Sequence, residues 1–253
     1  MPFPRSRRII AGFLDVARRK HLVHALVELD VTLPRRLLRD HRARTGESLS
    51  FTAFVIAALA RAVEEHPMVQ AYRLGRRRLV VFDDVDVCVL VEHEGGDGRI
   101  AAPYVVRAAN QRTYREIHDE LRALQSGGMA AHRRMEAGGR IPVFLVRWGW
   151  RLVAGRPRLW KRLCGTVCVT AVGMFGKGPG WGIPIGGYTL QLTIGGIGTR
   201  PGFAPDGGIE AREYLSLTLS VDHDVVDGAP AARFLQRLKE LIEGGHTIAA
   251  TAG

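Results

Sequence analysis

From Leu215 to Asp222, apolar and polar residues alternate without exception. The apolar positions are Leu215, Leu217, Leu219 and Val221, and the polar ones are Ser216, Thr218, Ser220 and Asp222. Strict alternation with a period of two predicts a β-strand, from Tyr214 to Asp222, that buries one face and carries polar side chains on the other. The spacing of Leu235, Leu238 and Ile242 then predicts an amphipathic helix from Gly228 to about Glu243. The segment therefore predicts a strand, a turn and a helix.

The other elements do not follow the steady strand–helix alternation of a parallel α/β fold. Helices are predicted over residues 7–19, 33–45, 50–66 with Ser50 as N-cap, and 113–125. Strands are predicted over residues 21–32, 71–73, 78–82, 85–92, 100–106, 167–172 and 188–194, the four from 71 to 106 as one antiparallel meander. We expect a single α+β domain with a mostly antiparallel sheet flanked by helices.

His223 follows the alternating strand at the parity of its buried face. An imidazole in a low-dielectric pocket at a strand end is well placed to act as a general base. Two structural interpretations stand beside this one. His223 can be a hydrogen-bonded core residue, and Asp227 can serve only as the N-cap of the helix that follows.

Positive charge is concentrated in one segment. The chain has a formal net charge of +11, and residues 131–164 contain eight Arg and one Lys against Glu136 alone. A local basic segment, without a helix-turn-helix, zinc-finger or RNA-recognition signature, does not favour a nucleic-acid partner. Gly155 and Pro157 would divide this segment into two short amphipathic helices. Peripheral membrane contact, partner docking, contact with the phosphates of a cofactor and a helical cap over the protein's own core all remain open for it.

The cysteines Cys88, Cys164 and Cys168 show no Cys-x-x-Cys spacing and no histidines at metal-ligand spacing. We expect reduced thiols that act as small apolar side chains, no metal, and a cytoplasmic protein. Residues 9–14 are too short for a secretory core. The Gly-rich stretch 176–187 lacks Gly-Lys-Ser/Thr and is interpreted as a turn rather than a phosphate-binding loop.

His223, Asp227, Gly228 and Ala229, followed by Pro-Ala-Ala-Arg-Phe-Leu, resemble the signature of the dihydrolipoamide acyltransferase catalytic domains of 2-oxoacid dehydrogenase complexes. The same His-x-x-x-Asp-Gly element occurs in chloramphenicol acetyltransferases and peptide-synthetase condensation domains. Further similar stretches are residues 7–11, 28–32, 49–67, 83–87, 165–170 and 172–176. The resemblance implies a chloramphenicol acetyltransferase-like fold over nearly the whole chain, with residues 131–164 as an insertion.

By this resemblance, His223 is the base that converts a thiol into a thiolate, because a thiol with a pKa of ~8.5 is mostly protonated at neutral pH. Thr170 occupies the family's Ser or Thr position and would donate a hydrogen bond to the oxyanion, although it could be an ordinary strand threonine. Asp227 would order the site through an ion pair with Arg7 or Arg8. Gly228 would allow a chain reversal with close backbone approach.

The family further implies a homotrimer whose active site lies between subunits, with the histidine from one chain and the hydroxyl from its neighbour. The substrate would be coenzyme A in its acyl form. The acceptor would be a lipoyl group on another protein or a small molecule. No metal is implied.

Three features depart from the family's pattern. Asp224 stands where Arg usually follows the histidine, and we expect it to raise the imidazole pKa or to contact a different substrate, alongside Gly228. The sequence shows no lipoyl or peripheral-subunit-binding domain. Residues 244–253 are small and polar where complex cores end in bulky apolar residues, which predicts a free trimer. The alternative hypothesis is a non-catalytic trimeric scaffold that docks partners through the basic insertion.

Overall fold

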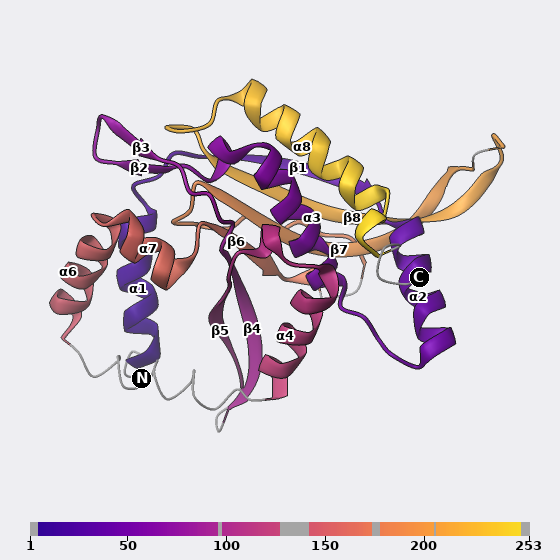
Figure 1. Cartoon of the computed structure of the whole chain (residues 1–253), viewed down its shortest axis with the longest axis horizontal. Coiled ribbons are helices and arrows are strands. Elements are labelled where there is room, and N and C mark those ends of the chain that lie inside the picture. Colours follow the sequence, from indigo (N-terminus) through magenta and orange to yellow (C-terminus); the bar gives the residue numbers. More distant parts are fainter. Residues whose placement is uncertain (1–4, 96–97, 127–141, 174–177, 205, 249–253) are drawn as a thin grey trace.

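The computed structural model describes residues 5–95, 98–126, 142–173, 178–204 and 206–248. A six-stranded sheet in the order β1-β8-β7-β6-β4-β5 forms its centre (Figure 1). The strands are β1 (Leu22–Asp30), β4 (Val87–Gly95), β5 (Gly98–Val106), β6 (Val167–Ala171), β7 (Leu190–Phe203) and β8 (Ile209–Asp222). Only β6 pairs in parallel, with β4 and β7. The prediction of an α+β fold with a mostly antiparallel sheet is confirmed.

Helices cover both faces of this sheet. They are α1 (Arg5–Ala17), α2 (Thr32–Thr45), α3 (Phe51–Glu65), α4 (Tyr114–Ser126), α6 (Val143–Ala154), α7 (Pro157–Cys164) and α8 (Gly228–Glu243), with short 3-10 turns η1 (Pro67–Gln70) and η2 (Ala109–Gln111). No helix in the described part of the chain has the length and apolar character needed to cross a membrane. α8 has the predicted bounds.

The larger core lies between the sheet and the adjacent helices α3 and α8 (Figure 1). Ser50 is the N-cap of α3, as predicted, and its side chain accepts a hydrogen bond of 3.2 Å from the amide of Ala53. Leu217 of β8 packs in this core with Phe54 and Phe234, all fully buried. The apolar face of the alternating strand is therefore the inner face, as expected from the sequence.

The opposite face of the sheet carries a smaller aromatic core. Its members are Tyr72, Phe82, Cys88, Trp160, Cys164, Cys168 and Tyr188. Trp160 of α7 stacks on Phe13 of α1 with ring centroids 6.0 Å apart. The three cysteines are free and buried, and burial raises the pKa of Cys164 to about 12. The thiols thus act as small apolar groups, and α6 and α7 are separate helices, both as predicted.

The polar face of β8 is also buried, which the alternation alone did not indicate. Ser216, Thr218, Ser220 and Asp222 are all inaccessible to solvent. The loop of residues 178–187 packs here, since the amide of Gly180 donates to Ser216 Oγ at 3.2 Å. A Cβ on Gly186 would lie 1.8 Å from Gln191 Oε1, so glycine lets this loop approach the sheet closely.

Two sequence predictions need correction. β7 and β8 continue as an exposed hairpin beyond the predicted ends at 194 and 214, after a register shift between Ile194 and Ile197. Outside the core, nothing selects for hydrophobic alternation, so the pattern carried no signal there. The predicted meander over 71–106 is divided: β2 (Tyr72–Leu74) and β3 (Arg78–Val80) form a hairpin separate from the main sheet.

Substitution by alanine should change the stability of the fold in opposite directions at Gly195 and Gly149. A Cβ on Gly195 would lie 2.1 Å from the carbonyl oxygen of Gly180, so Gly195→Ala should destabilise the fold by about 1–3 kcal/mol. Gly149 lies within α6 and has no neighbour within 4 Å of such a Cβ, so Gly149→Ala should stabilise by about 0.5–1 kcal/mol. Urea unfolding followed by circular dichroism tests both. Equal midpoints for wild type and Gly195→Ala would contradict the packing argument.

Candidate active site

The turn after β8 is built around Asp222. Its side chain is 3% exposed, and its Oδ2 accepts a hydrogen bond of 2.7 Å from Lys20 Nζ. Its Oδ1 accepts from the amide of Asp224, and its carbonyl oxygen accepts from the amides of Val225 and Val226. These bonds end the extended chain at Asp222 and fix the residue that follows.

His223 is that residue, and the structure corrects its predicted burial. Its side chain is 50% exposed, because the turn breaks the alternation that would have placed it inside. Its amide donates to the carbonyl oxygen of His21 at 2.9 Å. The backbone is therefore anchored at both sides of the turn while the imidazole faces outward. An exposed imidazole can exchange protons with a bound substrate.

Asp227 lies 4.0 Å from His223, measured from its Oδ1 to Nδ1. This separation is too long for a hydrogen bond but allows an ion pair when the imidazole is protonated. Asp227 occupies the N-cap position of α8 without making a side-chain cap bond. Gly228 does not support the predicted close approach, because nothing lies within 4 Å of where its Cβ would be.

The ion pair predicted between Asp227 and Arg7 or Arg8 does not form within the described chain. Both arginines lie in the first turn of α1, and Arg8 is about 14 Å of helix away from Ala17 at its end. Lys20, just beyond that end, supplies the cation at this turn instead, and it pairs with Asp222. No local pattern predicted this pair, because the two residues are separated by 202 positions.

Asp224 does not direct a free charge at the imidazole. Its Oδ1 lies 3.1 Å from His21 Nδ1, and its Oδ2 pairs with Arg73 of β2. Both carboxylate oxygens therefore have partners inside the chain, and the contact with a substrate stays a prediction. Arg73 and His21, which the sequence analysis missed, attach the turn to β2 and to the start of β1.

Thr170 lies on β6, on the polar face of the sheet, and is partly exposed. It pairs with Thr193 of β7, which pairs with Thr218 of β8. Both of these neighbours are buried, and their hydroxyls have no hydrogen-bond partner in the described structure. A row of three threonines thus crosses neighbouring strands. The alternation placed Thr218 on the polar face of β8, but no sequence pattern indicated that Thr170 and Thr193 lie beside it.

Thr170 and His223 are far apart within one chain. His223 follows Thr218 by five residues, or roughly 16 Å of extended chain, and β6 is two strand spacings of ~4.8 Å from β8. These steps place the two residues roughly 19 Å apart. Their side chains cannot span that distance, so they can act on one substrate only if two chains supply them.

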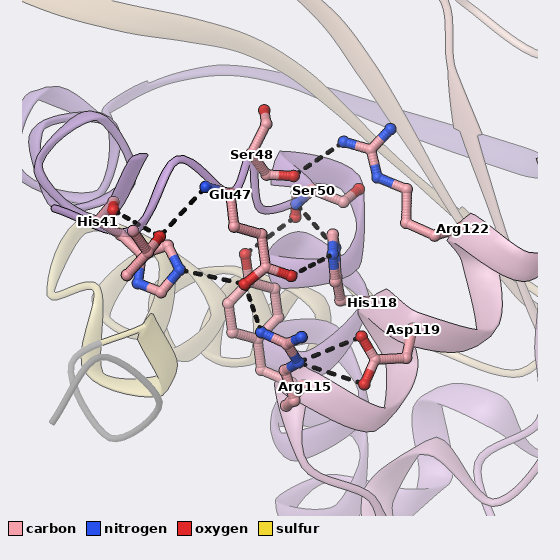
Figure 2. A network of polar contacts seen from close by, with 10 residues as sticks. His41, Glu47, Ser48, Ser50, Arg115, His118, Asp119 and Arg122 are labelled. Carbon is pink, nitrogen blue, oxygen red and sulfur yellow. Dashed lines mark hydrogen bonds and ion pairs between the residues drawn. The ribbon is translucent and has the colours of Figure 1, made fainter. Parts of the chain in front are cut away.

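A second polar cluster joins α2, α3 and α4 (Figure 2). Ligand atoms of Glu47, His118 and Asp119 lie within 4.8 Å of one another, which raises the question of a metal ion. Arg115 Nη1 donates to Glu47 Oε2 at 2.7 Å, and His41 Nε2 lies 3.4 Å from the same oxygen. The carboxylate is therefore already neutralised by an arginine.

The tautomer of His118 also disfavours a metal. Its Nδ1 accepts the amide hydrogen of Ser50 at 3.0 Å, so the neutral ring carries its proton on Nε2. Nε2 is the atom that faces Glu47, at 3.7 Å. A metal there would displace this proton to Nδ1, where it would oppose the Ser50 amide. We therefore interpret the cluster as a polar joint that holds the start of α3.

This joint predicts a pH dependence of stability. Burial lowers the pKa of His118, so the folded state favours the neutral ring. The charged neighbours are Arg122 and Arg115, which lower this pKa, and Asp119 and Glu47, which raise it. As the pH falls through about 6.5, the unfolded chain binds the proton first, and stability decreases until the folded pKa is passed.

The substitution His118→Asn isolates this effect, because the asparagine oxygen can accept from the Ser50 amide without titrating. Urea midpoints measured between pH 5 and 8 should fall more steeply with acid for wild type than for His118→Asn. Parallel curves for the two proteins would assign the acid sensitivity to other groups.

Comparisons with known proteins place this site in a family context. The model for the 2-oxoacid dehydrogenases acyltransferase catalytic domain matches residues 2–137 and 163–250. The match includes Thr170 and residues 223–229 and leaves out residues 138–162. The unmatched residues contain α6 and most of α7.

Curated relatives carry acyltransferase names. The lipoamide acyltransferase component of the branched-chain alpha-keto acid dehydrogenase complex of Bacillus subtilis is 27% identical over 249 residues, covering 96% of this chain and 52% of that protein. A dihydrolipoyllysine-residue succinyltransferase component of the 2-oxoglutarate dehydrogenase complex of Staphylococcus saprophyticus is 26% identical, covering 94% and 51%. The chain thus spans about half the length of these relatives.

Solved structures share the fold. A probable dihydrolipoamide acetyltransferase from Listeria monocytogenes has a TM-score of 0.70 at 23% identity, covering 96% of this chain and 94% of that one. The cubic core of the pyruvate dehydrogenase multienzyme complex has a TM-score of 0.73 at 20% identity, covering 98% and 93%. A chloramphenicol acetyltransferase has a TM-score of 0.55 at 13% identity, covering 95% and 96%. The expected fold is confirmed.

Proposed function

The chain belongs to the family of 2-oxoacid dehydrogenase acyltransferase catalytic domains, and from this we propose that it is an acyltransferase. The proposed reaction transfers an acyl group between coenzyme A and a dihydrolipoyl group or another small acceptor. The observation that carries the proposal is the half-exposed imidazole of His223, which the turn after β8 fixes in place. One relative is named a lipoamide acyltransferase and another a dihydrolipoyllysine-residue succinyltransferase. These names support a dihydrolipoyl group as the acceptor.

In the proposed mechanism, His223 accepts the proton of the attacking thiol. The thiolate adds to the thioester carbonyl, and the resulting oxyanion accepts a hydrogen bond from the Thr170 hydroxyl. The tetrahedral intermediate then expels the second thiolate, which recovers the proton from the imidazolium. One oxyanion donor contributes about 2.7–4 kcal/mol in comparable sites. Asp227, 4.0 Å from Nδ1, would stabilise the imidazolium that forms.

We propose that the working form is a homotrimer with its active sites between chains. The separation of roughly 19 Å between Thr170 and His223 supports this, because one chain cannot bring them together. Exposed apolar side chains near the polar face of the sheet would become covered by a second copy. They are Leu26, Val172, Trp181, Ile183 and Ile185.

The surroundings of Asp224 weaken the alternative of a non-catalytic scaffold. Asp224 was the departure from the family pattern that motivated this alternative. Because its carboxylate is neutralised by Arg73 and contacts His21, it holds the turn in place and presents no free charge to the base. The site therefore retains the groups that the proposed chemistry needs.

The first prediction concerns the chemical step. With acetyl-, propionyl- or branched-chain acyl-coenzyme A and dihydrolipoamide, His223→Ala should lower thiol release by about 10²–10⁴-fold. Thr170→Ala should lower kcat by about 10²–10³-fold, and Thr170→Ser should retain activity because it keeps the hydroxyl. Sedimentation velocity must show unchanged assembly. Full turnover by assembled His223→Ala would exclude His223 as the base.

The second prediction concerns the two-chain site. His223→Ala and Thr170→Ala chains, carrying different tags and mixed equally in one trimer population, should recover about a quarter of wild-type activity. The recovery arises because a quarter of the interfaces pair an intact histidine with an intact threonine from the neighbour. Trimers verified to contain both tags yet lacking activity would show that both groups come from one chain.

A further inference from the structure

Helices α6 and α7 form a surface that the proposed reaction does not use. They lie together with α1 at one side of the molecule (Figure 1). Most of their residues fall in the segment 138–162, which the family model leaves unmatched. The sequence from 137 to 205 contains no Asp or Glu. This surface therefore needs an explanation of its own.

One face of α6 is occupied by α1. Val146 is buried there, and a Cβ on Gly12 would lie 2.8 Å from Val146 Cγ1. The indole nitrogen of Trp150 donates to the carbonyl oxygen of Ile9 at 3.2 Å, and its ring contacts Phe13 edge to face. These contacts fix the rotation of α6 about its axis.

No described element covers the opposite face of α6. At 100° per residue, Phe144, Trp148 and Arg151 fall within about 60° of one another and point away from Val146 and Trp150, and Arg147 lies at the edge of this face toward α1. Phe144 is 70% exposed and Trp148 is 60% exposed. Large aromatic side chains are rarely left so exposed next to one another unless they mark a contact site. Together with Leu145 they line a surface hollow.

Arg147 and Arg151 line the same hollow as these aromatic residues, and further arginines follow on α7. Exposed arginines without an ion pair in the described structure are Arg151, Arg156, Arg158 and Arg162. Arg147 pairs with Asp15 of α1 at 2.8 Å. We call the exposed residues Phe144, Leu145, Trp148 and Arg151 of α6, with Arg158 and Arg162 of the adjacent α7, the outer face. It combines exposed apolar groups with uncompensated positive charge.

We propose that this outer face binds the anionic surface of a lipid bilayer. Its arginines complement anionic headgroups, and Phe144, Leu145 and Trp148 can enter the boundary between headgroups and acyl chains. The 12 residues of α6 extend about 18 Å, less than the ~30 Å hydrocarbon core, so the helix would lie along the surface. A two-fold contact, in which this face would meet the same face of a second copy, is disfavoured because it would place arginines against arginines.

Co-sedimentation with vesicles tests the proposal. Wild-type protein should bind vesicles of phosphatidylcholine mixed with phosphatidylglycerol, bind pure phosphatidylcholine weakly, and dissociate as salt is raised. The double variants Phe144→Ala/Trp148→Ala and Arg151→Glu/Arg158→Glu should each lower partitioning by about tenfold or more. The matched control is Phe203→Ala, which removes an aromatic side chain that is 77% exposed on the hairpin and should bind like wild type.

The fluorescence of Trp148 provides a second measurement, which leaves the apolar surface of α6 in place. Brominated lipids should quench part of the tryptophan emission of wild type, and Trp148→Phe should keep vesicle binding while losing that part. Circular dichroism and thiol release should stay unchanged in all α6 variants, which separates this proposal from the proposed function.

Three outcomes would overturn the proposal. They are no binding to anionic vesicles, equal binding to neutral vesicles, and wild-type partitioning of Phe144→Ala/Trp148→Ala. Self-association of wild type that disappears in the same double variant, without vesicle binding, would assign the surface to a second copy of the chain instead.

Discussion

The buried ion pair between Lys20 and Asp222 is the contact on which the candidate site depends. It joins the segment after α1 to the end of β8, across 202 positions of sequence. The Asp222 carboxylate also accepts the amide of Asp224, and its carbonyl oxygen accepts those of Val225 and Val226, so this one residue ends the strand and sets the backbone position of His223. Removing Lys20 would leave the Asp222 carboxylate, which is 3% exposed, without its cation, and this would destabilise the fold. The position of the base is thus tied to the stability of the sheet.

Both faces of the sheet are covered, and this has consequences for assembly. The face with Leu215, Leu217 and Leu219 packs against α3 and α8. The polar face lies under the loop of residues 178–187, where glycines allow the backbone to come within contact distance. That loop presents Ile183 and Ile185 to the outside. The exposure of these side chains and the separation of Thr170 from His223 are the two features on which the proposal of a site shared between copies rests.

Local patterns predicted the elements well where burial enforces them. The helix of Gly228–Glu243 and the N-cap of Ser50 follow directly from spacing and capping chemistry. Predictions failed where a distant partner decides the outcome. Asp224 looked like a free charge beside the base, but it forms an ion pair with Arg73 and contacts His21. Arg7 and Arg8 looked like partners of Asp227, but α1 places them at its far end.

The sequence by itself determined the α+β class, the strand that ends before His223, the amphipathic helix after it, and the family to which these motifs belong. These depend on periodicity and neighbouring residues, which are local properties of a chain. Only the tertiary structure decided the exposure of His223, the ion pairs that hold its turn, and the distance to Thr170. Those depend on which strands lie side by side, because the register between β6, β7 and β8 brings together residues that the sequence separates.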